Sequence, residues 1–395
     1  MGGETRRYID PTERRSRLAL RHRLTPDTRA ASPEEVAGSL VALHGTDPAT
    51  VYLAVGARLA DAAQTVARTE RALYTDGTLL RMHGMRHTVF VFPADLTAVV
   101  HASTGLTIAA RERATLLKDM AKAGAPDAAW LTAVEESALA ALARRGQATA
   151  VELALDEPRL KEQFGYATGK SYAGTHTVST RLLKVLGLEG KVVRGRPLGS
   201  WTSNQFRWAV APGHPQLAVP EAQSTLLGRW LACCGPATEA DLKWWTGWKV
   251  TDVRRALAAI GAREVTVDEG PAYVTADDAG PVAAPAGPWA ALLPALDPTA
   301  MGWRQRDWYL APDLRAPLFD YSGNVGPTVW WNGRVVGAWA QRPDGDLTWR
   351  ALVPGGVGRE AETAIDAEVT RLRTWLGPAR VTPRMRTPAE RELSG

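Results

Sequence analysis

The sequence predicts an α+β protein built from tandem winged-helix (helix-turn-helix) units, followed by a small C-terminal β-barrel or meander and a closing helix. The pattern Gly-x-Ala-Thr-x-x-acid-Leu occurs twice, at residues 146–153 and 235–242. After each copy come a helix-type segment that ends in glycine and then a β-type segment, so the repeat indicates tandem units of one kind. Beyond residue 280 the pattern changes to short strands separated by turn residues, which predicts the β-barrel.

Length and composition exclude several classes of protein. The chain has 395 residues, of which 45% are apolar and 23% charged. It is therefore too long for one small module, and its composition excludes wholesale disorder and fibrous repeats. The two cysteines, Cys233 and Cys234, are adjacent, so they cannot form a disulfide framework and they lack the spacing of metal ligands.

The first winged helix is expected at residues 17–103, after a flexible arm at residues 1–16. Ser32 and Asp47 each precede a proline, an arrangement typical of a helix N-cap and the first helical residue. The first of these two helices is expected to run to about Leu43. The other elements expected in this unit are a short helix at 18–24, a helix at 65–74 and a β-hairpin at 79–92.

The later units follow from the repeat and from turn signals. Thr149 and Thr238 are placed to N-cap the first helix of each copy. Asn332-Gly333 between two β-type runs predicts a two-residue hairpin, and a closing helix is expected at 359–376. The expected boundaries are a basic second winged helix at 104–212, a third at 213–280, a β-barrel domain with a terminal helix at 281–377 and a disordered tail at 378–395.

Basic charge is concentrated in one segment, which indicates a polyanionic partner. Residues 159–207 contain nine Lys and Arg against two Glu, a local charge of 9 − 2 = +7, whereas the whole chain carries +5. Basic, hydroxyl and aromatic groups gather at 170–184, at the start of a recognition-type helix, a combination typical of contact with the DNA backbone. A solvated basic face is the alternative. The expected DNA-binding residues are Arg81, His83, Arg86, His87, Lys170, Ser171, His176, Ser179, Arg181, Lys184, Arg194 and Arg196.

Together these motifs resemble the AlkZ/YcaQ-like winged-helix DNA glycosylases, over about residues 17–375. The resemblance implies three tandem winged helices and a C-terminal β-barrel that together cradle DNA. It also implies excision of alkylated purines, either in repair or as self-resistance of a producer to a DNA-alkylating natural product. The segments that carry it are Leu43–Pro48, Arg81–Thr88, Leu292–Pro298, Met301–Arg304, Gly323-Asn324 and Val329–Trp339.

The family's catalytic motif is Gln-Φ-Gln or Gln-Φ-Asp, where Φ is an apolar residue, and the matching tripeptide here is His44-Gly45-Thr46. A neutral His44 would accept a proton from the attacking water, and the hydroxyl of Thr46 would hold that water. Asp47 would place negative charge beside the sugar cation. The alternative is that Asp47 caps a helix and that His44 is a hydrogen-bonded, half-buried residue.

The leading hypothesis is a monofunctional DNA glycosylase that acts on double-stranded DNA without a metal or cofactor. Its lesion would be an alkylated purine or an adduct of an alkylating or intercalating small molecule. The rivals are a non-catalytic winged-helix protein that binds DNA or a ligand, and a scaffold repurposed for small-molecule chemistry. No signal peptide or membrane span is expected, so the protein should be cytoplasmic, nucleoid-associated when bound to DNA, and monomeric. Trp303 or Trp308 would stack on an extruded base.

Overall fold

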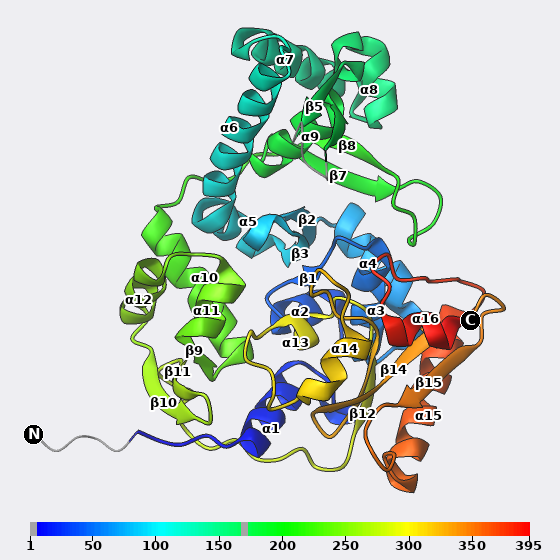
Figure 1. Cartoon of the computed structure of the whole chain (residues 1–395). Helices are drawn as coiled ribbons and strands as arrows, with labels where there is room; N and C mark the ends of the chain where they lie inside the picture. The colour runs from blue at the N-terminus through cyan, green and yellow to red at the C-terminus, as the bar shows by residue number, and fades with distance from the viewer. Residues whose placement is uncertain (1–5, 167–172) are drawn as a thin grey trace, which may run out of the picture.

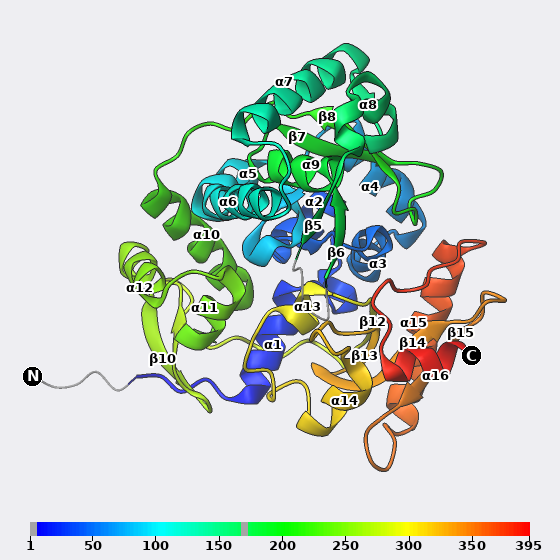
Figure 2. The ribbon, with the colours of Figure 1, turned by 45° about the horizontal axis from the view of Figure 1, so that its top comes forward.

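The computed structural model describes residues 6–166 and 173–395 as a mixture of helices and small antiparallel sheets (Figure 1). Its elements group into four units: the first unit (11–100), the middle unit (106–210), the third unit (219–274) and the C-terminal unit (290–394). Figures 1 and 2 both show the middle unit at one end of the molecule. None of the helices in the described residues is long and apolar enough to cross a membrane.

The first unit packs α-helices around a three-stranded antiparallel sheet. Its elements are α1 (Pro11–Arg21), α2 (Pro33–Ser39), β1 (Leu43–His44), α3 (Pro48–Arg58), α4 (Thr65–Tyr74), β2 (Leu79–His83), β3 (Val89–Pro93) and α5 (Ala94–Val100). The sheet order is β1-β3-β2, so the predicted hairpin and the predicted helix α4 are both confirmed. The helix expected to reach Leu43 instead ends at Ser39, because Leu43 and His44 pair with β3.

The middle unit begins after a short π-helix, His101–Gly105. Its elements are α6 (Leu106–Lys122), α7 (Ala128–Arg145), β4 (Gln147–Ala148), α8 (Ala150–Asp156), β5 (Gln163–Tyr166), β6 (Gly174–Thr177), α9 (Val178–Leu188), β7 (Val192–Pro197) and β8 (Phe206–Val210). Thr149 caps α8 in a capping box with Glu152, as the repeat predicts. One hydrophobic cluster, drawn entirely from residues of this unit, forms its core.

The third unit repeats the same plan on a smaller scale. Its elements are α10 (Val219–Cys234), β9 (Ala237–Thr238), α11 (Glu239–Thr246), α12 (Val250–Ala259), β10 (Arg263–Val267) and β11 (Gly270–Val274). Thr238 caps α11 in a second capping box, with Asp241. In the first three units a two-residue strand (β1, β4 or β9) pairs with the second strand of a hairpin, which gives the orders β1-β3-β2, β4-β8-β7 and β9-β11-β10.

The C-terminal unit is an open sheet, so the expected meander is present, as β13-β14-β15, but the expected barrel is not. Its elements are β12 (Ala290–Leu293), α13 (Pro298–Met301), α14 (Arg315–Leu318), β13 (Thr328–Trp331), β14 (Arg334–Gln341), β15 (Leu347–Ala351), α15 (Arg359–Leu376) and α16 (Pro388–Ser394). The sheet order is β12-β13-β14-β15, and β12 and β15 lie at opposite edges because four strands are too few to close a barrel. The predicted hairpin and the closing helix α15 are confirmed.

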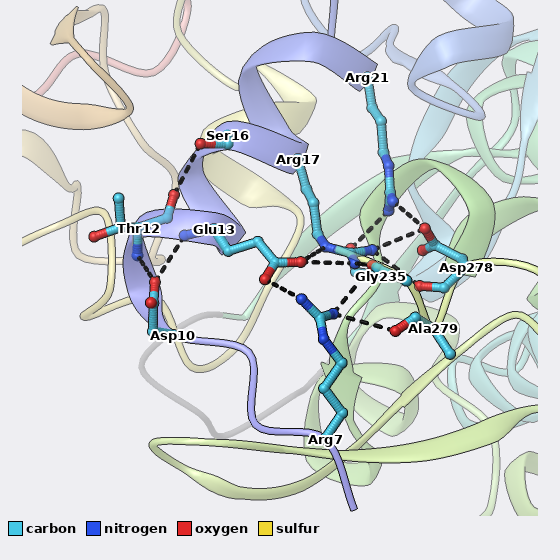
Figure 3. Close-up of polar contacts among 11 residues, drawn as sticks. Arg7, Asp10, Thr12, Glu13, Ser16, Arg17, Arg21, Gly235, Asp278 and Ala279 are labelled. Carbon is cyan, nitrogen blue, oxygen red and sulfur yellow. Dashed lines mark hydrogen bonds and ion pairs between the residues drawn. The ribbon is translucent and has the colours of Figure 1, made fainter. Parts of the chain in front are cut away.

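The segment expected to be a flexible arm, 1–16, is packed in its described part, residues 6–16. Most of α1 lies there, and Arg14 is only 2% exposed. Figure 3 shows one reason: the guanidinium groups of Arg17 and Arg21 both donate to the carboxylate of Asp278, at 2.8 and 2.5 Å. These partners are more than 250 residues apart in the sequence, so the local charge pattern alone suggested a loose arm.

The tail at 378–395 is also ordered, which corrects the expected disorder. The backbone N–H of Val381 donates to the side chain of Gln341 at 2.8 Å, and α16 then packs against β14. Two of the arginines that suggested a solvated tail make side-chain hydrogen bonds: Arg386 donates to Glu390 and Arg380 to the carbonyl of Asp344, each at 2.7 Å. In Figure 1 this segment, coloured red, lies beside β14 and β15.

A buried ion pair joins the first unit to the C-terminal unit. The side chains of Arg58 and Asp297 are both 0% exposed, and the guanidinium donates two hydrogen bonds to the carboxylate, at 2.9 and 2.7 Å. Arg58 also donates to the carbonyl of His22 at 2.9 Å, and Asp297 accepts the N–H of Thr299 at the start of α13. Every strong donor and acceptor of the pair is therefore used, as a buried charge requires.

Removing one partner of this pair should be strongly destabilising, because the other charge would stay buried without a counter-ion. We expect Asp297→Ala to lower the free energy of unfolding by about 3–5 kcal/mol, measured by urea denaturation with tryptophan fluorescence. The control is Asp346→Ala, whose ion pair with Arg373 is half exposed and should contribute little. Equal losses in the two variants would contradict this interpretation.

Candidate active site

His44 lies on β1, beside Phe90 of β3, and faces an open cavity of about 560 Å³. The two rings meet edge to face, with their centroids 5.3 Å apart. Burial, and after it the charge of Arg86, lowers the pKa of His44 to about 3. The imidazole is therefore neutral at any pH above about 4. The residue after His44 is Gly45. A Cβ at this position would lie 3.3 Å from the backbone of β3, which is tighter than ordinary contacts, so glycine fits here.

The cavity is formed where the first, third and C-terminal units meet. Its wall combines arginine, aromatic and amide groups, and it contains no carboxylate among the described residues. Nor do the described residues include a group of three or more His, Cys, Asp or Glu placed to hold a metal ion. The lining residues are His44, Arg86, Thr88, Trp244, Met301, Arg304, Arg306, Arg315, Phe319, Ser322, Gly323 and Asn324.

Trp244 of α11 organises the cationic part of the wall. The guanidinium of Arg86 lies 4.1 Å from the centroid of its ring, and that of Arg306 lies 5.5 Å away. Burial, and then the charge of Arg306, lowers the pKa of Arg86 to about 10, so Arg86 remains charged at neutral pH. Stacking on an aromatic ring holds each guanidinium plane in place while its N–H groups stay available for a phosphate.

The turn between β2 and β3 presents Arg86 to this cavity through a strained backbone. Arg86 and His87 both have positive φ, at 55° and 61°, a region that non-glycine residues rarely occupy. Gly247, at the end of α11, packs against the Arg86 side chain, where an added Cβ would lie 3.4 Å away. The turn is thus held in place by the third unit.

Asp241 positions the opposite wall. Its carboxylate is 0% exposed and accepts the backbone N–H groups of Arg304 and Gln305, at 2.9 and 2.8 Å. The same carboxylate accepts the N–H of Thr238 in the capping box of α11. One buried acid therefore fixes both the helix that carries Trp244 and the loop that carries Arg304.

Two of the three expected catalytic residues lie outside the cavity wall. Asp47 is buried, and its two oxygens accept the N–H groups of Ala49, in the first turn of α3, and of Arg384. It therefore acts as a helix cap and as an anchor of the C-terminal segment. Thr46 is half-buried, and its backbone N–H lies 3.5 Å from His44 Nδ1, a long and weak contact.

Two of the expected DNA-contacting residues on the first hairpin are buried. His44, Phe90 and Met82 stand opposite one another in the sheet, so the side chains of Arg81 and His83 project from its other face. There they are 5% and 7% exposed. Burial, and then nearby cations, lowers the pKa of His83 to about 3.

The expected basic face of the middle unit is largely neutralised by acids that lie elsewhere in the chain. Lys184 donates to Glu112 of α6 at 2.8 Å, and Arg181 lies 3.8 Å from Asp119 on the same helix. Of the other expected residues, Arg196 donates to Glu70 at 2.6 Å, and His87, whose pKa is lowered by burial, lies 3.3 Å from Glu112. Arg194 makes no ion pair among the described residues. Counting charge along the sequence missed these acids.

The remaining expected DNA-contacting residues lie on β6, α9 and β7, away from His44. The ring of His176 stacks on Tyr166 at 4.1 Å, and Ser179 Oγ lies 3.0 Å from Thr177 Oγ1, at the start of α9. Arg194 on β7 stacks on Phe206 at 4.5 Å. Lys170 and Ser171 lie outside the described residues.

Several residues of the cavity wall were missed as site residues, although five of them lie in segments that carried the family resemblance. Arg304 and Asn324 belong to such segments, and Arg306 follows two residues after the first of these. Trp244, which no sequence signal marked as a site residue, is half-buried and lines the cavity. The tryptophans expected to stack on a base, Trp303 and Trp308, are 2% and 7% exposed and belong to the core.

A cationic cavity with aromatic walls, at the junction of units with a repeated helix-and-hairpin plan, is typical of proteins that act on nucleic acids. A family model described as "DNA glycosylase AlkZ-like" matches residues 37–375, and the chain belongs to this family. Among solved structures, the Streptomyces sahachiroi DNA glycosylase AlkZ is similar, with a TM-score of 0.69 and 21% identity over 95% of this chain and 98% of that one. A search of curated proteins found no match.

Three histidines with lowered pKa values, two buried and one half-buried, should make folding stability depend on pH. Burial lowers the pKa of His22, His44 and His83 to about 3, whereas in the unfolded chain they titrate near 6.5. As the pH falls below about 6.5 the unfolded state takes up protons that the folded state does not, so stability is lost. We expect roughly 1.4 kcal/mol per pH unit for each histidine.

Urea denaturation at pH 7.0, 6.0 and 5.0 tests this expectation. His44→Gln should reduce the three-histidine contribution to the pH slope by about a third. His87→Gln, which removes an exposed histidine, is the control and should leave most of the slope intact. A parent-like slope in His44→Gln would mean that His44 takes up a proton in the folded state.

Proposed function

We propose that this protein is a DNA glycosylase that excises an alkylated or bulky-adducted purine from double-stranded DNA, with His44 activating the attacking water. Family membership supports a DNA glycosylase-type function and a DNA partner. The observation that carries the assignment of His44 is a neutral imidazole in the wall of an open, arginine-lined cavity.

The repeated sheet order supports an interpretation of the first three units as winged helices. The proposed DNA interface has two parts. The first is the cavity rim, where Arg86, Arg304 and Arg306 offer N–H groups to phosphates on either side of the lesion. The second part is the start of α9 with the neighbouring strand β6, and it includes His176, Ser179, Arg181 and Lys184. Acids of α6 already pair with Arg181 and Lys184.

In the proposed reaction the bond between the sugar C1′ and the purine nitrogen breaks, and its electron pair leaves with the base. An alkylated purine is already cationic, so this departure needs little protonation. Water then adds to the oxocarbenium carbon and gives its proton to the unprotonated ring nitrogen of His44. The long contact from Thr46 leaves Nδ1 only weakly engaged. Because the cavity wall lacks a carboxylate, the DNA phosphates held by the arginines supply the negative charge that stabilises the cation.

The cavity volume and the aromatic wall at Trp244 and Phe319 support a purine with a substituent as the extruded group. Such a lesion arises from simple alkylation, which would make the protein a repair enzyme. It also arises from a DNA-alkylating natural product, in which case the protein would give its producer self-resistance. We therefore propose both lesion types as substrates to test.

Single-turnover release of 7-methylguanine from duplex DNA tests the role of His44. We expect His44→Ala to lose at least tenfold in rate, the lower range for loss of a general base, and His44→Gln to retain more activity, since Gln also positions water. Because the pKa of His44 is about 3, the rate should stay level from pH 8 to about 5 and should not fall through 6.5.

Asp346→Ala, at a half-exposed site of the C-terminal unit outside the cavity, is the control and should release base at the parent rate. Equal rates in the parent, His44→Ala and His44→Gln would place catalysis elsewhere. No release by the parent from methylated or crosslinked duplexes that it binds tightly would favour the non-catalytic DNA-binding alternative.

DNA affinity should depend more on the cavity rim than on α9. Arg304 is exposed and the structure gives its side chain no ion pair among the described residues, whereas Lys184 is paired with Glu112. We expect Arg304→Gln to weaken duplex binding and to flatten the slope of log K against log salt by about 1, with a smaller effect for Lys184→Gln. Fluorescence anisotropy across a salt series measures both, and the reverse ranking would move the main interface to α9.

A further inference from the structure

Arg81 of β2 in the first unit and Arg194 of β7 in the middle unit lie on two strands that pack against each other, a contact that we call the β2–β7 seam. Arg81 is 5% exposed, and its Nε and Nη2 atoms are buried without a hydrogen-bond partner. Nε of Arg194 is likewise buried and unpartnered. Among the described residues, neither guanidinium makes an ion pair.

The two charges are close enough to act on each other. Burial, and then the charges of Arg81 and Arg384, lowers the pKa of Arg194 to about 10. Stacking on Phe206 at 4.5 Å and on Trp208 at 5.5 Å holds the Arg194 guanidinium in place. Like charges that are buried without a counter-ion destabilise the contact that contains them.

The other two arginines of the β7–β8 hairpin are balanced by acids, which sets Arg194 apart from them. On the same hairpin, Arg196 pairs with Glu70 at 2.6 Å and Arg207 with Glu152 at 3.1 Å. The first unit adds further donors at the seam, since the hydroxyl groups of Tyr52 and Tyr74 are also buried without a partner and the charge of Arg81 acts on Tyr52. Guanidinium and phenol donors without an acceptor match the oxygens of a phosphate.

We infer that a DNA backbone phosphate binds between Arg81 and Arg194 and bridges the first and middle units. This inference rests on the proposed DNA partner and adds a second contact on the sheet face opposite His44. The phosphate would offset the repulsion between the two cations, and each guanidinium would donate to its oxygens. Binding would thus tie the position of the middle unit to the strand whose base enters the cavity.

The construction of the middle unit permits the seam to open for a phosphate. This unit has its own hydrophobic core, and the chain enters it through the π-helix 101–105 and leaves it through residues 211–218, which form no helix or strand before α10. The two connections meet where the rings of His101 and His214 lie 4.7 Å apart, against Gly190. A rotation here would separate β7 from β2 and break the Arg196–Glu70 ion pair, while the core of the middle unit would stay intact.

The test compares the parent with the double variant Arg81→Gln/Arg194→Gln on an undamaged duplex, by fluorescence anisotropy across a salt series. We expect about a tenfold weaker Kd and a slope of log K against log salt that is flatter by about 1, the loss of one phosphate contact. Arg207→Gln, which removes a paired arginine from the adjacent strand, should keep the parent Kd and slope. The Tm of the free double variant should equal or exceed that of the parent, because two unbalanced buried charges are gone.

A second arm identifies the source of the phosphate. Thermal melts in inorganic phosphate and in chloride, at equal ionic strength, are compared for the parent and the double variant. If the double variant binds DNA with the Kd and salt slope of the parent, the inference is overturned. If, in addition, phosphate raises the Tm of the parent but not that of the double variant, the seam binds free phosphate. A lower Tm with an unchanged salt slope would instead show a purely structural pair. The duplex carries no lesion, so failure of base excision leaves this test unaffected.

Discussion

The buried contact between Arg58 and Asp297 is the constraint on which the site depends. It fixes α3, which directly follows the His44 segment, against α13, which leads into the loop that carries Arg304. Both ends of the pair make additional hydrogen bonds, to the carbonyl of His22 and to Thr299. An ion pair whose donors and acceptors are all hydrogen-bonded tolerates few alternative arrangements. It therefore fixes the relative position of two walls of the cavity that come from segments some 240 residues apart.

The third wall depends on a different kind of bond. The carboxylate of Asp241 on α11 accepts two backbone N–H groups of the 304–305 loop. The turn at Arg86 packs against the end of the same helix at Gly247. The strained backbone at Arg86 and His87 is maintained because these contacts surround it. The strained turn places the Arg86 guanidinium over the ring of Trp244, where it borders the cavity.

Charge balance separates structural arginines from those available to a polyanion. Arg17 and Arg21 converge on Asp278 and hold α1 in place (Figure 3). On α9, acids of α6 balance the cations that a count along the sequence leaves in excess. Among the described residues, the arginines without an ion pair include Arg304 at the cavity rim. They also include Arg81 and Arg194 at the β2–β7 seam, on the opposite face of the same small sheet. A strand of DNA that contacts both would link base extrusion to the placement of the middle unit.

Local signals were enough to predict much of the secondary structure. Caps at Asp47, Thr149 and Thr238, the Asn332-Gly333 turn and the closing helix α15 depend on bonds within a few residues, so the sequence alone determined them. The cap at Asp47 also showed from the sequence that His44 lies just before the start of a helix. The resemblance of short segments also identified the family that the family model shows.

Only the tertiary structure decided which residues form the site. Arg81 and Arg86 are five residues apart on one predicted hairpin. Strand alternation places the side chain of Arg81 in the seam, whereas the turn places that of Arg86 at the cavity. The ordered N-terminal helix, the ordered tail and the open C-terminal sheet likewise depend on partners hundreds of residues away or on strand number. The sequence determined what each segment does by itself, whereas burial, charge balance and the meeting of distant walls require the folded chain, because their energies arise from contacts that no local window contains.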